Sequence, residues 1–293
     1  MAHKKQKLAT PGYILLSETF REWLELLGYS ALSIPALTLT VTDFLVYQEQ
    51  RERAMLDKLQ ATDANAFLQA VQARKPTSNG HYNKQVQALR LFSRFIRETG
   101  RSHVGFNLAR LKEMKRKPSW LTKPEIQSLY DVTGDTILGI RDRAMLAVFY
   151  GCGLRLNEGA SLELKDLNRS TKILHVRKGK HYKERLIPVA DRNLQAICFY
   201  IDQVRPQLLQ EVHHTNLFVD ANKGRPMHKQ SLYIRIKQLT KKAKLQKKVG
   251  THTLRHSIAT HLLQSGMKLE RIQQFLGHGD LDSTQLYTHL AND

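Results

Sequence analysis

The chain has 293 residues, and its 46 lysines and arginines against 26 aspartates and glutamates give a formal net charge of +20. Residues 1–116 carry +8 of this charge and residues 117–293 carry +12, so both parts of the chain are basic and nucleic acid is the predicted partner. No apolar run approaches the length of a membrane span, which predicts a cytoplasmic protein that does not contact a membrane.

The first hundred residues have the apolar periodicity of a small all-α unit. The pattern predicts helices over 13–27, 42–53, 62–74 and 81–98, and Gly28 and Gly100 end the first and the last of them. The last helix carries Arg90 and Arg94. Either they belong to a solvated basic face or they contact DNA phosphates, and we count them as candidate DNA-binding residues.

A basic segment that ends in Pro118 divides the chain. We predict an N-terminal helical domain over residues 1–110, a linker over 111–119 and a second domain over 120–293. Just after the linker, Thr122, Pro124 and Glu125 have the types and the spacing expected at the start of a helix. They would serve as N-cap, first-turn proline and capping-box acid.

The second domain changes its apolar period once. Helical patterns over 137–152, 154–162, 194–209, 229–245 and 253–264 surround two alternating segments, 173–177 and 185–189, which are joined by a basic turn over 178–183. The predicted fold is therefore mainly α, with a small β-hairpin in the C-terminal domain. Cys152 and Cys198 have apolar neighbours and are predicted to be buried thiols, not a disulfide or a metal site.

Two residues at the start of the helix over 253–264 are candidates for phosphate chemistry. His252 and Arg255 lie three positions apart and share a face, so we expect a partly buried guanidinium with an exposed imidazole beside it. His252 and His256 also have the spacing of a helical zinc pair. However, threonine follows His252 where a metalloprotease has glutamate, and Arg255 would place positive charge beside the metal, so no metal is predicted.

Further candidates are spread along the C-terminal domain. Arg155 stands at a predicted helix start, where the helix dipole favours anions, and Lys178 follows the first predicted strand beside a glycine. His278 lies between two glycines, which allow the backbone to approach a ligand closely. Tyr287 follows nine residues later, one position off the apolar stripe of a short final helix.

Together these segments resemble the signature motifs of the tyrosine recombinases, the phage-type integrase family. Residues 141–158 resemble the first signature box, and residues 178–189 resemble the catalytic β-hairpin of the family. Residues 252–261 and 276–279, followed by Tyr287, resemble the second box. The helical N-terminal unit is similar to the SAM-like core-binding domain, and within the family the chain is most similar to the short XerC/XerD-type and transposon-encoded integrases.

The resemblance implies a role for each matching residue. Tyr287 would be the nucleophile that forms a 3′-phosphotyrosyl link, and Glu158 matches the acidic residue that supports the first arginine. The hairpin is longer than is usual in the family, so either Lys178 or Lys180 could be the catalytic lysine. The remaining catalytic positions would be filled by Arg155, Lys178, His252, Arg255 and His278.

The implied activity is site-specific recombination of double-stranded DNA through a Holliday junction, without a cofactor. It would serve integration and excision of a mobile element, inversion or dimer resolution. The implied partners are inverted-repeat core sites and a homotetramer on two duplexes, alone or with a second recombinase, in the nucleoid. Two alternatives are a type IB topoisomerase and a non-catalytic DNA-binding regulator. Phosphate contacts are predicted for Lys180, Lys183, Lys237, Lys241, Lys242, Lys244, Lys247 and Lys248.

Overall fold

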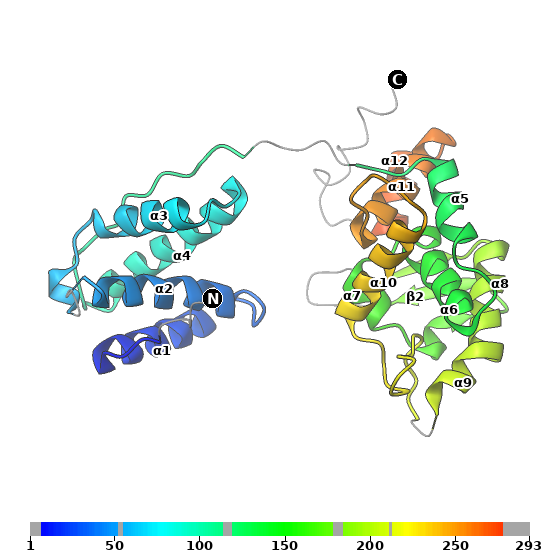
Figure 1. Cartoon of the computed structure of the whole chain (residues 1–293), viewed down its shortest axis with the longest axis horizontal. Helices are drawn as coiled ribbons and strands as arrows, with labels where there is room; N and C mark the ends of the chain where they lie inside the picture. The colour runs from blue at the N-terminus through cyan, green and yellow to red at the C-terminus, as the bar shows by residue number, and fades with distance from the viewer. Residues whose placement is uncertain (1–6, 52–54, 114–118, 178–183, 211–212, 278–293) are drawn as a thin grey trace. The chain divides into compact units, whose positions relative to one another are not determined.

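The computed structural model describes residues 7–51, 55–113, 119–177, 184–210 and 213–277. The chain forms two compact units, Met1–Lys115 and Arg116–Asp293, and each unit has its own hydrophobic core (Figure 1). The fold is mainly α, as predicted. Among the described residues, no helix is both long enough and apolar enough to cross a lipid bilayer.

The described part of the N-terminal unit is helical. Aromatic side chains fill its core, with the rings of Phe20 and Phe92 meeting edge to face at 5.6 Å and those of Phe44 and Phe67 at the same distance. The elements are α1 (Pro11–Leu26), α2 (Ile34–Glu49), the 3₁₀ turn η1 (Leu56–Lys58), α3 (Asp63–Arg74) and α4 (Asn79–Glu98).

Helix α2 corrects one sequence prediction. It begins at Ile34, whereas the apolar pattern placed its start at residue 42. Pro35 lies in the first turn, where its missing N–H needs no partner, and Ile34 and Leu37 are buried against the core. The segment thus joins the helix through tertiary packing that its local apolar spacing did not indicate.

The C-terminal unit surrounds a larger core with helices and one small sheet. The predicted start at Thr122 is confirmed, because its hydroxyl and the Glu125 carboxylate form a complete capping box. The helical elements are α5 (Lys123–Asp131), α6 (Ile137–Leu146), the π turn η2 (Ala147–Gly151), α7 (Leu156–Ala160), the 3₁₀ turn η3 (Leu164–Asp166), α8 (Asp191–Phe199), the π turn η4 (Tyr200–Val204), α9 (Arg205–Leu209), α10 (Lys229–Lys242), α11 (Thr251–Gln264) and α12 (Leu269–Leu276).

The sheet contains both predicted strands. Strand β2 (Ile173–Val176) pairs antiparallel with β3 (Arg185–Pro188), and a two-residue strand β1 (Leu167–Asn168) pairs with the other edge of β2. Strand β1 was not predicted, because two residues are too few to display an alternating pattern. In β3 the alternation is clear: Arg185 and Ile187 face the core, while Leu186 is 63% exposed.

The two cysteines are free thiols in different environments. Cys152 is fully buried, as predicted, and desolvation raises the pKa of its thiol to about 12. The prediction of a buried Cys198 is wrong, because this residue on α8 is only partly covered. Its apolar neighbours in the sequence lie on other faces of the helix, as the 53% exposure of Phe199 shows.

Candidate active site

Three arginines from separate segments meet one buried carboxylate, that of Glu158 in α7. The Arg155 guanidinium lies 3.0 Å from the carboxylate and that of Arg185 2.9 Å from it, while Arg255 in α11 approaches to 3.9 Å. The Glu158 side chain is 2% exposed, and those of Arg185 and Arg255 are 6% and 5% exposed. Arg155 is the most accessible of the three, with 21% of its side chain exposed.

The turn between η2 and α7 positions Arg155. Gly153 reverses the chain there in the left-handed region, at φ +63°. Arg155 then takes the N-cap position of α7, as its predicted place at a helix start requires. Its backbone N–H donates to Glu158 Oε2 at 2.8 Å, and its Nη1 donates to Oε1 at 3.0 Å. One carboxylate therefore fixes both the backbone and the side chain of Arg155.

Backbone carbonyls hold Arg255 in place. Its Nη1 donates to the carbonyl oxygen of Gly153 at 2.7 Å and its Nη2 to that of Leu276 at 2.6 Å. The sequence predicted a guanidinium held in a fixed orientation, and these two hydrogen bonds confirm it. The side chain is more deeply buried than the predicted partial burial.

The last turn of α12 receives all three arginines. The carbonyl oxygens of Phe275, Leu276 and Gly277 accept in succession from Arg185 at 3.0 Å, Arg255 at 2.6 Å and Arg155 at 3.4 Å. Cations are favoured at this end of a helix, because its free carbonyls carry the negative end of the helix dipole. These contacts fix the position of Gly277, while His278 and Tyr287 lie outside the described residues.

The charge balance of this cluster favours an anion. Burial by itself would raise the pKa of Glu158, but the hydrogen bonds and charge of Arg185, the Arg155 N–H and the charge of Arg255 lower it to about 2. Glu158 is therefore ionised at neutral pH, and the arginines keep their protons. Three guanidiniums against one carboxylate leave an excess of two positive charges among these four side chains.

His252 lies at the start of α11, exposed as predicted, on the same helix as Arg255. Although its surface reaches solvent, the surrounding protein partly desolvates the imidazole, and this desolvation together with the positive charges of Arg255 and Arg155 lowers its pKa. His252 is therefore mostly neutral at pH 7, and a neutral imidazole can accept a proton.

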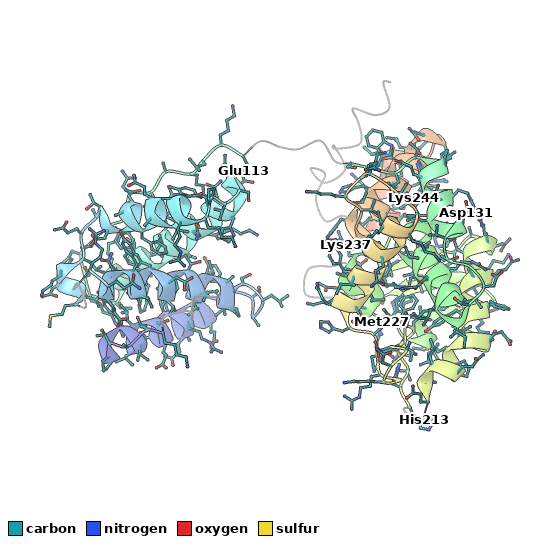
Figure 2. All side chains as sticks on the ribbon, viewed as in Figure 1. Glu113, Asp131, His213, Met227, Lys237 and Lys244 are labelled. Carbon is teal, nitrogen blue, oxygen red and sulfur yellow. The ribbon has the colours of Figure 1, made fainter. Side chains whose placement is uncertain are left out.

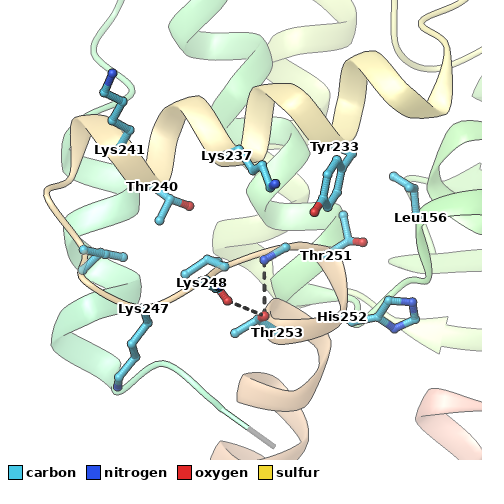
Figure 3. A pocket seen from close by; sticks show the side chains of 13 residues that line it. Leu156, Tyr233, Lys237, Thr240, Lys241, Lys247, Lys248, Thr251, His252 and Thr253 are labelled. Carbon is cyan, nitrogen blue, oxygen red and sulfur yellow. Dashed lines mark hydrogen bonds between the residues drawn. The ribbon is translucent and has the colours of Figure 1, made fainter. Parts of the chain in front are cut away.

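A basic groove of about 720 Å³ leads away from His252 (Figure 3). Its walls are α10, the segment 245–250 and the start of α11. Lys237 and Tyr233 stand on the α10 side, with the Lys237 Nζ 4.8 Å from the centre of the Tyr233 ring. Four of the lysines predicted to contact phosphates line this groove: Lys237, Lys241, Lys247 and Lys248.

The other predicted DNA contacts of this region have different surroundings. Lys242 donates to the carbonyl oxygen of Val132 at 2.6 Å, and Lys244 is exposed just beyond the end of α10 (Figure 2). Lys247, although it lines the groove, also forms an ion pair of 2.7 Å with Glu125. Of the predicted set, Lys241 and Lys248 are thus the groove residues best placed for an external phosphate.

The two predicted contacts of the N-terminal unit share helix α4. Arg90 donates to the carbonyl oxygen of Leu108 and lines a shallow hollow with Arg97 and Phe106. Arg94 forms an ion pair of 2.7 Å with Glu98 and lies over the Trp23 ring.

Five predicted residues lie outside the described part of the chain: Lys178, Lys180, Lys183, His278 and Tyr287. The residue before the first of them is well fixed. Arg177 forms ion pairs of 2.9 Å with Asp166 and 3.0 Å with Glu163.

The sequence motifs assign no role to Arg185 beyond membership of the hairpin segment. Its guanidinium nevertheless faces both carboxylate oxygens of Glu158, at 3.0 and 2.9 Å. A signal was available in the strand pattern. Every second side chain of a strand points to the same face, so Arg185 lies on the same face as the buried Ile187 and Val189. A charged side chain on a buried face requires a partner.

Comparison with known proteins identifies relatives across the chain. The sequence profile of the Phage integrase family matches residues 119–293. The tyrosine recombinase XerD of Oceanobacillus iheyensis is 32% identical over 268 residues, which cover 90% of this chain and 89% of that protein. The XerD of Staphylococcus aureus is 36% identical over 226 residues, 72% of this chain and 76% of that protein.

Solved structures share the fold. The XerH site-specific recombinase bound to its difH substrate, in a pre-cleavage complex, has a TM-score of 0.71 at 20% identity, with 97% of this chain and 88% of that chain covered. The Tn1549 transposon integrase in complex with circular intermediate DNA has a TM-score of 0.68 at 18% identity, with 93% and 94% covered.

Proposed function

The chain belongs to the phage integrase family of tyrosine recombinases, and on that premise we propose which of its residues carry site-specific DNA recombination. Tyr287 is the proposed nucleophile. Its oxygen attacks the scissile phosphorus in line, a bond to phosphorus forms and the bond to the 5′-oxygen breaks. The product is a 3′-phosphotyrosyl link and a free 5′-hydroxyl, which then attacks the link on a partner strand.

The observation that carries the proposed reaction at a phosphate is the excess of two positive charges among Glu158 and its three arginines. In the proposed site, Arg155 and Arg255 bind the non-bridging oxygens of the scissile phosphate. The negative charge on these oxygens grows toward the transition state, and guanidiniums that are already held in position stabilise it without reorganising. The accessible Arg155 meets the phosphate from the solvent side, and the buried Arg255 from the protein side.

Proton transfer is assigned to groups on either side of that phosphate. A tyrosine hydroxyl has a pKa near 10 and needs a base at neutral pH. His252 is the proposed acceptor, supported by its lowered pKa and its position three residues before Arg255. The leaving 5′-oxygen takes a proton from Lys178 or Lys180, and His278 donates a hydrogen bond to the phosphate.

Duplex DNA is the proposed substrate of both units. Residues 1–110 act as a core-binding domain through Arg90 and Arg94, and residues 120–293 as the catalytic domain. In this proposal Lys241 and Lys248 bind backbone phosphates, and their place in the groove beside His252 supports an approach of the duplex from this side (Figure 3). Two inverted half-sites on each of two duplexes assemble four copies of the chain, and strands exchange through a Holliday junction.

Covalent trapping on nicked suicide duplexes of random sequence tests this function. We expect adducts on a small set of sequences that contain two inverted half-sites. Adducts without sequence preference, together with relaxation of any supercoiled plasmid, would instead identify a type IB topoisomerase. Binding to duplex DNA without any adduct would identify a non-catalytic regulator.

A further inference from the structure

Arg185 contacts the catalytic cluster from the interior of the protein. Among the described residues, its guanidinium makes three hydrogen bonds, all internal: Nη1 and Nη2 donate to the two oxygens of Glu158, and Nε donates to the carbonyl oxygen of Phe275 at 3.0 Å. With 6% of its side chain exposed, it is far less accessible than Arg155. We therefore do not expect Arg185 to touch DNA.

The position of Arg185 decides which cation neutralises Glu158. Arg185 occupies both carboxylate oxygens in a fork-to-fork geometry, the strongest arrangement that this pair can make. Arg155 shares one of these oxygens at 3.0 Å, and Arg255 stays 3.9 Å away from the other. Without Arg185, the buried carboxylate would have Arg155 and Arg255 as its counter-charges within the described part of the chain, and it would draw both of them toward itself.

We propose that Arg185 is a positioning residue for strand cleavage: it neutralises Glu158 from the interior, so that the charges of Arg155 and Arg255 remain available to the scissile phosphate. This inference rests on the proposed function, because it concerns the same phosphate. It adds that the hairpin supplies, besides a lysine, the cation that sets the electrostatics of the arginine pair.

A purely structural role makes different predictions. Arg185 also ties β3 to α12 through the Phe275 carbonyl, and Gly277 lies so close that an added Cβ would be 2.8 Å from Arg185 Cδ. If this anchoring were its whole contribution, the charge of Glu158 would not matter to the reaction. The two roles can therefore be separated by removing the charge of Glu158 as well as that of Arg185.

The test compares Arg185→Met, Arg185→Lys, Glu158→Gln and the double variant Arg185→Met/Glu158→Gln. Glutamine keeps an acceptor oxygen for the Arg155 N–H while it removes the negative charge. The matched control is the pair Arg235 and Asp142, a contact of 2.6 Å between a partly exposed arginine on α10 and a fully buried carboxylate on α6. The readout is the single-turnover rate of adduct formation per folded molecule, on the duplex that wild-type protein selects, together with the affinity for that duplex.

We expect Arg185→Met to lower the adduct rate by about 10- to 100-fold, the range seen when a group that orients a reacting residue is removed. Affinity for the duplex should change little. Arg185→Lys should keep more of the rate than Arg185→Met, and the double variant should recover most of what Arg185→Met loses. In the control pair, Arg235→Met should leave the rate per folded molecule unchanged. The proposal is overturned if the double variant is as slow as Arg185→Met and if Arg185→Lys is also as slow as Arg185→Met.

A second measurement does not depend on strand cleavage. Inorganic tungstate, a tetrahedral dianion, serves as the probe, and its affinity is measured by the rise in melting temperature or by calorimetry. We expect Arg185→Met to weaken tungstate binding by about tenfold and Glu158→Gln to restore it in the double variant. If wild-type protein forms no adduct, the proposed function fails, while the tungstate series still decides the role of Arg185. Equal tungstate affinity in wild type and Arg185→Met contradicts it.

Discussion

The guanidinium of Arg255 donates a hydrogen bond of 2.7 Å to the carbonyl oxygen of Gly153, which lies 102 residues earlier in the chain. Arg155 follows Gly153 by two residues, so this bond joins, through the backbone, the two arginines that we propose to bind the scissile phosphate. The same guanidinium binds the Leu276 carbonyl at 2.6 Å. Helix α11, the turn before α7 and the end of α12 are thereby held as one unit, and each of them contributes to the site.

Gly153→Ala should therefore impair both stability and cleavage. An added Cβ would lie 2.9 Å from Leu276 Cδ2 and 3.1 Å from Phe275 Cε1, at a φ of +63° that alanine adopts with strain. We expect a loss of about 1–3 kcal/mol in the free energy of unfolding, measured by urea denaturation, and a lower adduct rate per folded molecule.

Gly134→Ala is the matched control for this variant. Gly134 has a similar φ of +67°, but an added Cβ there would meet nothing within 4 Å. Gly134→Ala should lose only the free energy of unfolding that alanine costs at a left-handed φ, and its adduct rate should be normal. If the two variants had the same adduct rate per folded molecule, the Gly153 turn would not position Arg155.

Arg155→Lys and Arg255→Lys test whether each guanidinium binds the phosphate in a bidentate manner, as we propose. Lysine keeps the charge but lacks the planar fork, so we expect the adduct rate to fall by about 10²–10³-fold, with a smaller effect on DNA affinity. Arg255→Lys should also destabilise the protein, because the buried guanidinium serves two carbonyls. The control is Arg169→Lys, an exposed ion pair with Asp202 that should be neutral in both assays. Full activity of Arg155→Lys would argue against a bidentate role.

Stability should decrease as the pH falls from about 7.5 to about 5.5. His252, His256 and His261 on α11 all have pKa values below the ordinary 6.5, chiefly because of desolvation. The unfolded chain then binds more protons than the folded one between the lowered pKa values and 6.5, and stability rises with pH wherever that is so. The stabilisation is complete above 6.5 and is lost as the pH falls toward the folded values.

Urea midpoints across this pH range measure the effect. His256→Gln and His261→Gln should each flatten the dependence. His261 is the more demanding site, because its Nδ1 lies 2.9 Å from the Tyr150 hydroxyl and glutamine cannot reproduce the ring. A profile that is flat in the wild-type protein would contradict the lowered pKa values.

Neutralising Lys241 and Lys248 together should weaken binding to all duplex sequences. Each lost phosphate contact reduces the slope of log affinity against log salt by about 0.9, so we expect the slope to decrease by about 1.8. Lys223 and Lys229 are exposed lysines of the same unit that do not line the groove, and their replacement by glutamine should have little effect. If affinity fell for one sequence only, the lysines would be reading bases.

Local chemistry made much of the fold predictable. The Thr122 capping box, the buried segment after Ile137 and the strand alternation at β3 are decided by neighbours within a few residues. The start of α2 and the two-residue strand β1 are decided by tertiary contacts, so apolar spacing did not locate them. The predicted helix over 229–245 is too long, because α10 ends at Lys242. The chain leaves the helix through a left-handed φ of +53° at Lys244, and a lysine at such a position gives no sequence signal of a helix end, whereas a glycine would.

The site was predicted unevenly for the same reason. His252, Arg155 and Arg255 lie at helix starts, where sequence patterns are informative, and the structure places them as expected. Motif similarity pointed to Glu158, but nothing local indicated that Arg185 pairs with it across 27 residues. The successive carbonyls at the end of α12 could not be predicted either, because a backbone acceptor has no side-chain signature.

Tyr287→Phe decides whether Tyr287 is the nucleophile. Wild-type protein is incubated with the nicked suicide duplex that it selects, and the adduct is digested and located by mass spectrometry. Tyr233→Phe is the control, because Tyr233 is another tyrosine of the groove beside His252 (Figure 3). We predict a 3′-phosphotyrosyl adduct on Tyr287 in wild type and in Tyr233→Phe, and none in Tyr287→Phe. A covalent adduct that persists in Tyr287→Phe would show that another residue is the nucleophile.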